Sequence, residues 1–257
     1  MVVIVFLVLF PLLWMFVSSF KTQQQIISMP PVWVFKPVVK NYVTVIVEND
    51  FLRYTGNSAI VALFSTVLSL ILGLPAAYTI SRYRQKKLNL TILVARLLPG
   101  ISFLLPWFII FRKLHLIDTY VALIGSHMVI ALPLIVWIMA NYFDGIPREL
   151  EEAAAVDGCT KQRAFAHIVV PLSGPGIMTA VTLTIIFSWN NFMFSFILSN
   201  AKTKTLPLAI YNFVSYAEIN WGAVMAAATI IIAPALVMTM VFQKYVVKGL
   251  TAGAVKG

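Results

Sequence analysis

The chain carries its densest acidic run at Glu149-Leu150-Glu151-Glu152-Ala153-Ala154-Ala155-Val156-Asp157-Gly158. This run lies between two apolar segments, each long enough to cross a lipid bilayer. Charged side chains are costly inside lipid, so the run must project into water. Its consecutive alanines leave a shallow surface that suits docking to another molecule. The run therefore predicts a water-exposed loop between two membrane spans.

The composition is that of a membrane protein. Hydrophobic residues make up 60% of the chain and charged residues only 11%, whereas soluble domains carry about 25% charged residues. The net charge of +10 does not indicate a nucleic-acid partner, because most Lys and Arg residues stand at the ends of apolar segments, where membrane proteins place them. The single cysteine, Cys159, excludes an intrachain disulfide and a multi-cysteine metal site.

Six segments meet the requirement of about 20 apolar residues for a spanning helix. We therefore predict an all-α membrane protein with six transmembrane helices. The predicted spans are Val2–Phe20, Asn57–Ile80, Leu90–Phe111, Tyr120–Tyr142, Gly176–Ser199 and Gly222–Tyr245. The chain then divides into a first span with a long outer loop (1–56), a core transmembrane domain (57–247) and a short tail (248–257). Prolines inside the spans, such as Pro99, either kink helices around a cavity or are simply tolerated there.

An even number of spans places both termini on one side of the membrane, together with the loops 81–89 and 143–175. The first of these loops contains four basic residues, Arg82, Arg84, Lys86 and Lys87. Because cytoplasmic loops carry an excess of Lys and Arg, this side is predicted to be cytoplasmic. We therefore expect a multi-pass protein with both termini in the cytoplasm.

The loop 143–175 is predicted to fold as a helix, a sharp turn and a second helix. Pro147 suits a first helical turn, and the acidic residues that follow suit a helix N-terminus. Gly158 suits the left-handed position that ends a helix. Thr160 is expected to cap a second helix, and Pro171 is expected to end it after about Val169. By these residues alone, the hairpin is either a docking element or an ordinary solvated hairpin.

This loop resembles the EAA loop of permeases from ATP-binding-cassette (ABC) importers. The family pattern is EAA-x3-G-x9-I-x-L-P. The matching residues, in the same order and spacing, are Glu152-Ala153-Ala154, Gly158, Ile168 and Val170-Pro171. Val170 replaces the family's Leu, which is a mild apolar change. The flank Ile146–Glu151 and Asp157 are also similar to the family.

Further stretches are similar to the carbohydrate permeases related to the maltose permease subunit MalG. These are type I importer permeases with the MetI-like architecture. The stretches are Ser18–Thr22, Asn57-Ser58, Leu98–Gly100, Leu116–Tyr120, Ser188–Asn190, Asn220–Ala227 and Gly249–Gly257. Because they follow one another in family order along nearly the whole chain, the chain is identified as a member of this family.

The resemblance implies a permease subunit of an ATP-driven, binding-protein-dependent sugar importer in a bacterial or archaeal plasma (inner) membrane. Such a subunit forms half of the translocation pathway. The implied partners are a second MalG- or MalF-type permease, usually a different chain, two ATP-binding subunits, an extracytoplasmic solute-binding protein and a sugar or polyol. The ATP-binding subunits hold ATP and Mg²⁺, so no cofactor and no enzyme activity are expected in this chain. The sequence has no Gly-Lys pair for a P-loop.

The resemblance also assigns ATPase coupling to the EAA loop. Glu152 would pair with a basic residue of the ATP-binding subunit, and Gly158 would make the turn. Ala153 and Ala154 would allow close approach. The implied coupling residues are Glu152, Ala153, Ala154, Asp157, Gly158, Ile168 and Pro171.

The fifth predicted span holds the candidates for the sugar pathway, Trp189, Asn190 and Asn191. Polar groups inside a membrane tend to face a cavity or a partner helix. The two asparagines therefore either contact sugar or hydrogen-bond between helices. Arg96, in the third span, either lines the inner cavity or reaches the cytoplasmic interface.

The loop 200–221 resembles the periplasmic loop that family members insert into the cleft of the binding protein. Tyr211, Tyr216 and Glu218 suit this role, although an aromatic interfacial belt explains the tyrosines equally well. A secondary, ion-coupled transporter is the alternative function for the chain. Against it, the predicted spans contain no Asp or Glu, so the carboxylates of a usual proton relay are missing.

Overall fold

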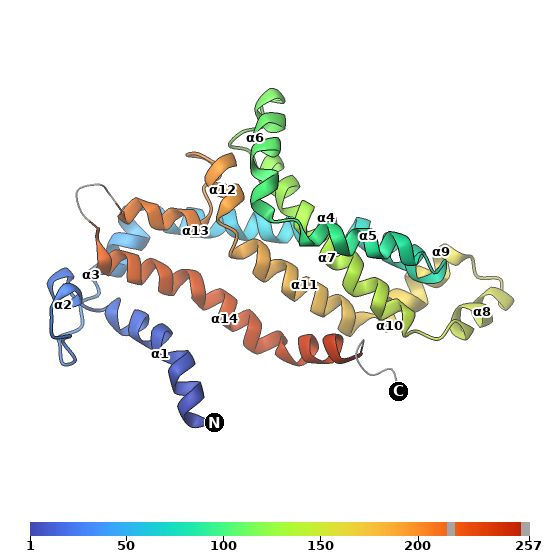
Figure 1. Cartoon of the computed structure of the whole chain (residues 1–257), viewed down its shortest axis with the longest axis horizontal. Coiled ribbons are helices and arrows are strands. Elements are labelled where there is room, and N and C mark those ends of the chain that lie inside the picture. Colours follow the sequence, from blue (N-terminus) through green and yellow to red (C-terminus); the bar gives the residue numbers. More distant parts are fainter. Residues whose placement is uncertain (215–218, 253–257) are drawn as a thin grey trace.

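The structure is a computed structural model that describes residues 1–214 and 219–252. In these ranges the regular elements are helices, and one isolated antiparallel bridge joins Val214 to Ile219. The main helices run along the long axis of an elongated molecule (Figure 1). The predicted all-α fold is confirmed.

The elements follow one another along the chain with short connections. They are α1 (Val2–Ser18), α2 (Gln23–Ile27), α3 (Lys40–Val43), η1 (Thr44–Glu48), α4 (Phe51–Arg82), α5 (Lys86–Leu97), η2 (Gly100–Phe103), α6 (Leu104–Lys113), α7 (Tyr120–Asp144), α8 (Glu149–Val156), α9 (Lys161–Ala164), η3 (Phe165–Val169), α10 (Val170–Leu172), α11 (Gly174–Trp189), α12 (Met193–Leu198), α13 (Leu206–Ala209), η4 (Ile210–Phe213) and α14 (Trp221–Ala252).

Four predicted spans correspond to single helices, namely α1, α4, α7 and α14. Of these, α4, α7 and α14 are long and apolar enough to cross a membrane alone, whereas α1 is shorter. Helix α4 begins at Phe51 rather than at the predicted Asn57. The buried Phe51 ring packs 6.1 Å from the Phe213 ring, and this contact draws the first turn into the fold. The predicted tail at 248–257 begins as the end of α14, and residues 253–257 lie outside the described residues.

The third predicted span is not one continuous helix. Its two parts, Lys87–Leu97 and Gly100–Lys113, are bent by 89°, and α6 stands almost upright against α5 in Figure 1. Leu98 has an extended backbone with ψ of 127°. This is the conformation that a following proline, here Pro99, imposes. The predicted span Leu90–Phe111 therefore consists of two helices with a sharp bend between them, and of the two alternatives for Pro99 the structure favours the kink.

The fifth predicted span is also broken. Helix α11 ends at Trp189 and α12 begins at Met193. Between them, the Asn191 side chain accepts a hydrogen bond from the Phe194 N–H at 3.1 Å. Asparagine side chains compete with the helical backbone for such donors, so this residue stops α11 and starts α12. The chain is also bent by 75° before α11, between Lys161–Leu172 and Gly174–Trp189.

Helix α7 lies at the centre of the fold. It packs against α4, α5 and α11, and α11 in turn packs against α14. Ile135, Met139 and Phe143 of α7 are fully buried, together with Ala77 of α4 and Ala180 of α11. Small residues at such contacts let helix backbones approach closely, and the resulting van der Waals packing is one source of helix association in lipid.

Buried polar side chains also connect the helices. The His127 Nδ1 atom of α7 lies 2.6 Å from the Ser188 hydroxyl of α11. The same hydroxyl lies 3.4 Å from that of Ser65 on α4. Polar contacts of this kind replace the water that is missing in lipid, so they fix how the three helices are rotated relative to one another.

The connection between α6 and α7 is bound to the segment after α12. The Asp118 carboxylate accepts hydrogen bonds from the N–H groups of Asn200 (2.9 Å), Lys202 (3.1 Å) and Thr203 (3.0 Å), and from the Thr203 hydroxyl (2.9 Å). The Asn57 side-chain amide of α4 donates to the Lys202 carbonyl at 3.1 Å. We call Asp118 and Asn57 the outer clasp.

The hydrogen bonds of the outer clasp determine the ionisation of Asp118. Partial burial by itself raises the pKa of the carboxyl group, but the four donors outweigh this effect and hold the pKa below its ordinary value. The carboxylate therefore stabilises the fold at pH values above its unfolded pKa of about 3.9. This stabilisation is lost as the pH falls through the lower pKa of the folded state.

Replacing Asp118 should weaken the fold. Asp118 has a left-handed backbone with φ of 60°, which Asn tolerates better than Ala. Asp118→Asn keeps one acceptor but loses the charge, so we expect a loss of about 1–3 kcal/mol in the free energy of unfolding, and a larger loss for Asp118→Ala. Thermal unfolding of the detergent-purified protein at neutral pH measures both losses. The loss in the free energy of unfolding of Asp118→Asn should become smaller at acidic pH.

Asp50→Asn is the matched control for this experiment. Asp50 is also left-handed, with φ of 50°, but its side chain makes no capping hydrogen bond. Its replacement should leave the unfolding temperature nearly unchanged. Equal losses at Asp50 and Asp118, or a loss at Asp118 that is independent of pH, would contradict the outer clasp.

Candidate functional site

The acidic run forms α8 and ends in a tight turn. Three acidic residues occupy its first turn, where the positive end of the helix dipole favours them. Gly158 has φ of +82°. Its N–H donates to the Ala155 carbonyl at 3.0 Å, and the Cys159 N–H donates to the Ala154 carbonyl at 2.8 Å. This pair of bonds is the Schellman motif, so the turn predicted at Gly158 is confirmed.

The second helix of the loop starts as predicted but ends later. The Thr160 side chain accepts the Arg163 N–H at 3.4 Å and caps α9. The helix then continues through η3 and α10 to Leu172, past Pro171, so the prediction that Pro171 ends it is wrong. The wide π-helical turn of η3, which directly precedes α10, makes room for the proline ring. The bend into α11 follows at Ser173.

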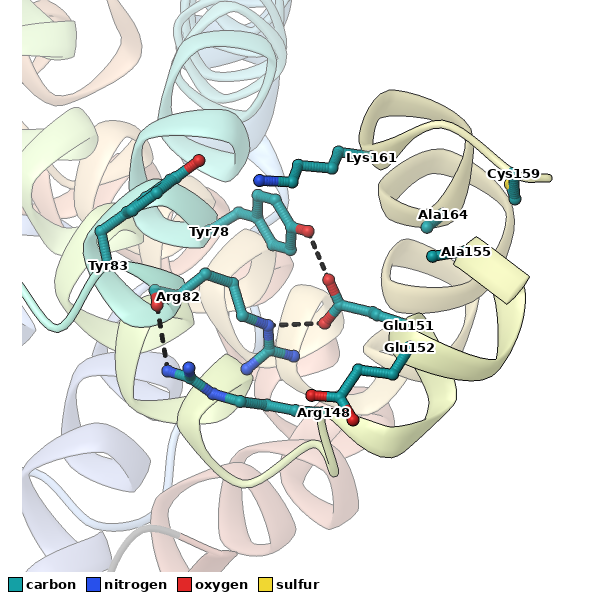
Figure 2. A pocket seen from close by; sticks show the side chains of 10 residues that line it. All are labelled: Tyr78, Arg82, Tyr83, Arg148, Glu151, Glu152, Ala155, Cys159, Lys161 and Ala164. Atoms are coloured by element: carbon teal, nitrogen blue, oxygen red, sulfur yellow. Dashed lines mark hydrogen bonds and ion pairs between the residues drawn. The ribbon is translucent and has the colours of Figure 1, made fainter. Parts of the chain in front are cut away.

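Glu151 connects α8 to the end of α4, as Figure 2 shows. Its carboxylate accepts a hydrogen bond from the Tyr78 hydroxyl and forms an ion pair with the Nε atom of Arg82 at 2.5 Å. The Arg82 and Glu151 side chains are only 10% and 15% exposed. Loss of one partner would leave a largely buried charge unpaired, so this pair holds α8 in one position against α4.

Arginine side chains extend this connection to the end of α7. Arg82 donates to the carbonyl groups of Phe143 at 2.8 Å and Ile146 at 3.4 Å. Arg148, just before α8, donates to the Arg82 carbonyl at 3.0 Å. The ends of α4 and α7 and the start of α8 therefore form one unit. We call it the inner cluster, and its residues are Tyr78, Arg82, Arg148 and Glu151.

A cavity of about 300 Å³ opens between the inner cluster and the hairpin of α8 and α9 (Figure 2). Lys161 of α9 lies on its rim, with its Nζ atom 5.7 Å from the centroid of the Tyr83 ring. Glu152, Ala155 and Cys159 also line it. The hairpin is therefore held at α8 through Glu151 and, just after α9, through Phe165, whose ring lies 4.8 Å from that of Tyr78.

The predicted coupling residues differ in exposure. Glu152, Ala153, Asp157 and Gly158 are exposed on the hairpin, as is Pro171, whereas Ala154 and Ile168 are half-buried. The exposed residues of α8 are free to meet a partner. Sequence reasoning missed Glu151. The sequence did contain an indication of this contact. Tyr78 and Arg82 stand four residues apart on one face of α4, so together they offer two donors to a carboxylate.

Two adjoining cavities of about 640 Å³ and 630 Å³ lie where α5, α7 and α11 meet. Both are lined by Arg96, Leu134, Phe187, Asn191 and Met193. Asn190 lines the second cavity, and its side chain also donates to the Ile186 carbonyl at 3.0 Å. Two of the three predicted pathway residues, Asn190 and Asn191, therefore lie at a cavity.

The third predicted pathway residue, Trp189, lies elsewhere. Its side chain is 6% exposed, and its indole N–H donates to the Ile231 carbonyl of α14 at 3.0 Å. This position favours helix packing rather than contact with a solute. Among the predicted loop residues, Tyr211 is 55% exposed and its ring stacks on that of Phe192 at 5.4 Å. Tyr216 and Glu218 lie outside the described residues.

Glu151→Gln is expected to loosen α8 from α4. The substitution leaves the Arg82 guanidinium without its ion-pair partner, so the free energy of unfolding should fall by about 1–3 kcal/mol. Thermal unfolding in detergent measures the loss, and Arg82→Gln with the double variant completes a double-mutant cycle. Glu152→Gln, at an exposed position of the same helix, is the control. Similar losses at positions 151 and 152, or no coupling between Glu151 and Arg82, would contradict the inner cluster.

Comparison with known proteins reveals the family. Residues 69–252 match the family described as the binding-protein-dependent transport system inner membrane component. The chain is 35% identical to a probable ABC transporter permease protein of Sinorhizobium fredii, over 99% of this chain and 92% of that protein. It is 37% identical to the trehalose/maltose transport system permease protein MalG of Thermococcus litoralis, over 97% and 92%.

A solved structure shows the same fold. It is the crystal structure of a bacterial ABC transporter involved in the import of the acidic polysaccharide alginate, and one of its chains matches with a TM-score of 0.77 and 22% identity. The match covers 95% of this chain and 92% of that one. The chain therefore belongs to the family of inner-membrane permease components of binding-protein-dependent ABC importers.

Proposed function

We propose that this permease subunit imports a sugar or polyol and forms half of the translocation pathway, together with a second MalG- or MalF-type permease that is a different chain. The similarity to a permease named for trehalose and maltose supports a carbohydrate solute. The side chains of Asn190 and Asn191 at the cavity support a solute with hydroxyl groups, since amide groups hydrogen-bond hydroxyl groups well.

The proposed assembly has three further components. Two ATP-binding subunits hold ATP and Mg²⁺ and perform the hydrolysis, and an extracytoplasmic binding protein delivers the solute. The permease chain itself hydrolyses no ATP. The segment that contains Tyr211, Tyr216 and Glu218 is the proposed contact with the binding protein, supported by the exposed Tyr211 side chain.

The α8–α9 hairpin is the proposed docking element for an ATP-binding subunit. The observation that supports this best is the difference in contacts between two neighbouring residues of α8. Glu152 is exposed, whereas Glu151 is bonded to Tyr78 and Arg82 of α4. Successive residues point about 100° apart around a helix, so one face of α8 is free for a partner while another holds the spans. A movement of α8 would therefore be passed directly to α4.

We propose that the hairpin and both termini lie in the cytoplasm and that the protein resides in a plasma (inner) membrane. The α8–α9 hairpin lies at one end of the long axis, and α2 and α3 lie at the other (Figure 1). This separation supports a transmembrane arrangement of the two loops. The basic residues at 82–87 stand at the hairpin end, in agreement with the charge distribution of cytoplasmic loops.

Reconstitution tests the proposed function directly. The complete complex in proteoliposomes should accumulate radiolabelled trehalose, maltose or another carbohydrate only with ATP at the ATPase face and with the binding protein at the other. The same panel of solutes is tested with the chain alone under proton and sodium gradients. Gradient-driven uptake by the chain alone would refute this function and favour a secondary transporter.

Glu152→Lys is expected to uncouple transport from ATP hydrolysis. The charge reversal on the exposed face of α8 should weaken docking of the ATP-binding subunit, because a basic partner residue would then face a lysine. We expect at least about a tenfold loss of ATP-dependent uptake and less co-purified ATP-binding subunit, with unchanged amounts of permease in the membrane. The control is Glu48→Lys, the same exchange at an exposed position of η1. Normal uptake by Glu152→Lys would count against docking through this face.

A further inference from the structure

Two interrupted helices meet at the cavities beside Asn190 and Asn191. The break between α5 and α6 at Leu98-Pro99 forms one wall, since Arg96, Leu98 and Gly100 line the first cavity. The break between α11 and α12 forms another, since Asn190, Asn191 and Phe192 line the second. Interrupted backbone is tolerated at membrane depth only where it is enclosed by protein or lines a watered cavity. Both breaks therefore border one chamber, whose lining is mostly apolar apart from Arg96, Asn190 and Asn191.

Arg96 is the one charged residue that lines this chamber among the described residues. It stands on α5, roughly 13 Å along the helix from Lys87 at about 1.5 Å per residue. The guanidinium lies 5.3 Å from the centroid of the Trp137 ring of α7. This cation–π contact orients the side chain but contributes no negative charge.

Among the residues that the structure describes, no acidic side chain balances Arg96. Neither cavity is lined by Asp or Glu, and the one ion pair formed between described residues is that of Arg82 with Glu151. An arginine remains charged under all physiological conditions, and the Arg96 side chain is exposed in this chain, so its guanidinium is open to a ligand. The chamber therefore favours an anion, which the guanidinium would bind through paired hydrogen bonds.

We propose that the solute carries an acidic group, a carboxylate, sulfate or phosphate, and that Arg96 binds this group while Asn190 and Asn191 bind neighbouring hydroxyls. This inference rests on the proposed function, because it specifies the class of sugar that passes the chamber. A neutral sugar would satisfy the asparagine amides but would leave the charge of Arg96 uncompensated. Arg96 is then a specificity-determining residue of the pathway.

The first experiment identifies the solute. The complete importer is purified without added sugar, and the small molecule retained by its binding protein is released by denaturation and analysed by mass spectrometry. We expect a carbohydrate with a carboxylate, sulfate or phosphate group. A neutral carbohydrate would overturn this inference and leave the proposed function intact. A solute that is not a carbohydrate would overturn the proposed function instead.

The second experiment tests the residue. ATP-dependent uptake of the recovered acid is compared in proteoliposomes between the wild type, Arg96→Gln and Arg96→Lys. Loss of a hydrogen-bonded charge should lower the initial rate about tenfold or more in the Gln variant. The Lys variant keeps the charge without the fork geometry, so it should retain a clearly higher rate than the Gln variant.

Arg112→Gln is the matched control for this comparison. Arg112 also stands in the last turn of its helix, α6, with its guanidinium 5.9 Å from the centroid of the Phe108 ring, but it does not line the chamber. Its replacement should leave uptake unchanged. Wild-type uptake by Arg96→Gln would overturn the inference. So would failure of both Arg96 variants to assemble, which would show that Arg96 pairs with a carboxylate of the partner permease.

Discussion

The close packing of α4 against α7 is the constraint on which the rest of the structure depends. At Gly73 a side-chain carbon would stand 2.9 Å from the Ile135 side chain, so a larger residue would force Ile135 or the two helices to shift. Helix α4 has 32 residues, which corresponds to about 48 Å. Its ends therefore emerge on opposite sides of the helical core. Asn57 near one end contributes to the outer clasp, and Arg82 at the other end belongs to the inner cluster.

Because of this arrangement, the packed helices α4 and α7 can transmit a displacement from one end of the core to the other. Side chains in a close-packed interior move together rather than independently, so a displacement of α8 through Glu151 reaches the whole of α4 and α7. The chamber beside Arg96 lies against the same α7 helix, through Leu134 and Trp137. The hairpin and the chamber are therefore joined through the same helix, α7.

Several features were predicted from local patterns because local chemistry controls them. Gly158 was predicted to end α8 because a left-handed residue there favours glycine. Thr160 was predicted to cap α9 because its side chain reaches an N–H three residues later. A kink at Pro99 was one of two alternatives from the sequence, whereas the break at Asn191 was not predicted, since an apolar run looks the same whether it forms one helix or two. The ion pair of Glu151 was missed for a different reason, because its partners are about seventy residues away.

By itself the sequence determined the all-α membrane fold, the position and turn of the hairpin, and the family pattern around Glu152. These depend on hydrophobicity, on backbone conformation and on spacing along the chain, which are local quantities. Only the tertiary structure decided which of two neighbouring residues contacts another helix and which stays exposed. It paired Glu151 with Arg82 and left Glu152 exposed, turned Trp189 toward α14, and brought Arg96 to the same chamber as Asn190 and Asn191. The physical reason is that burial and charge pairing depend on which helix faces come together, and packing between distant segments decides that.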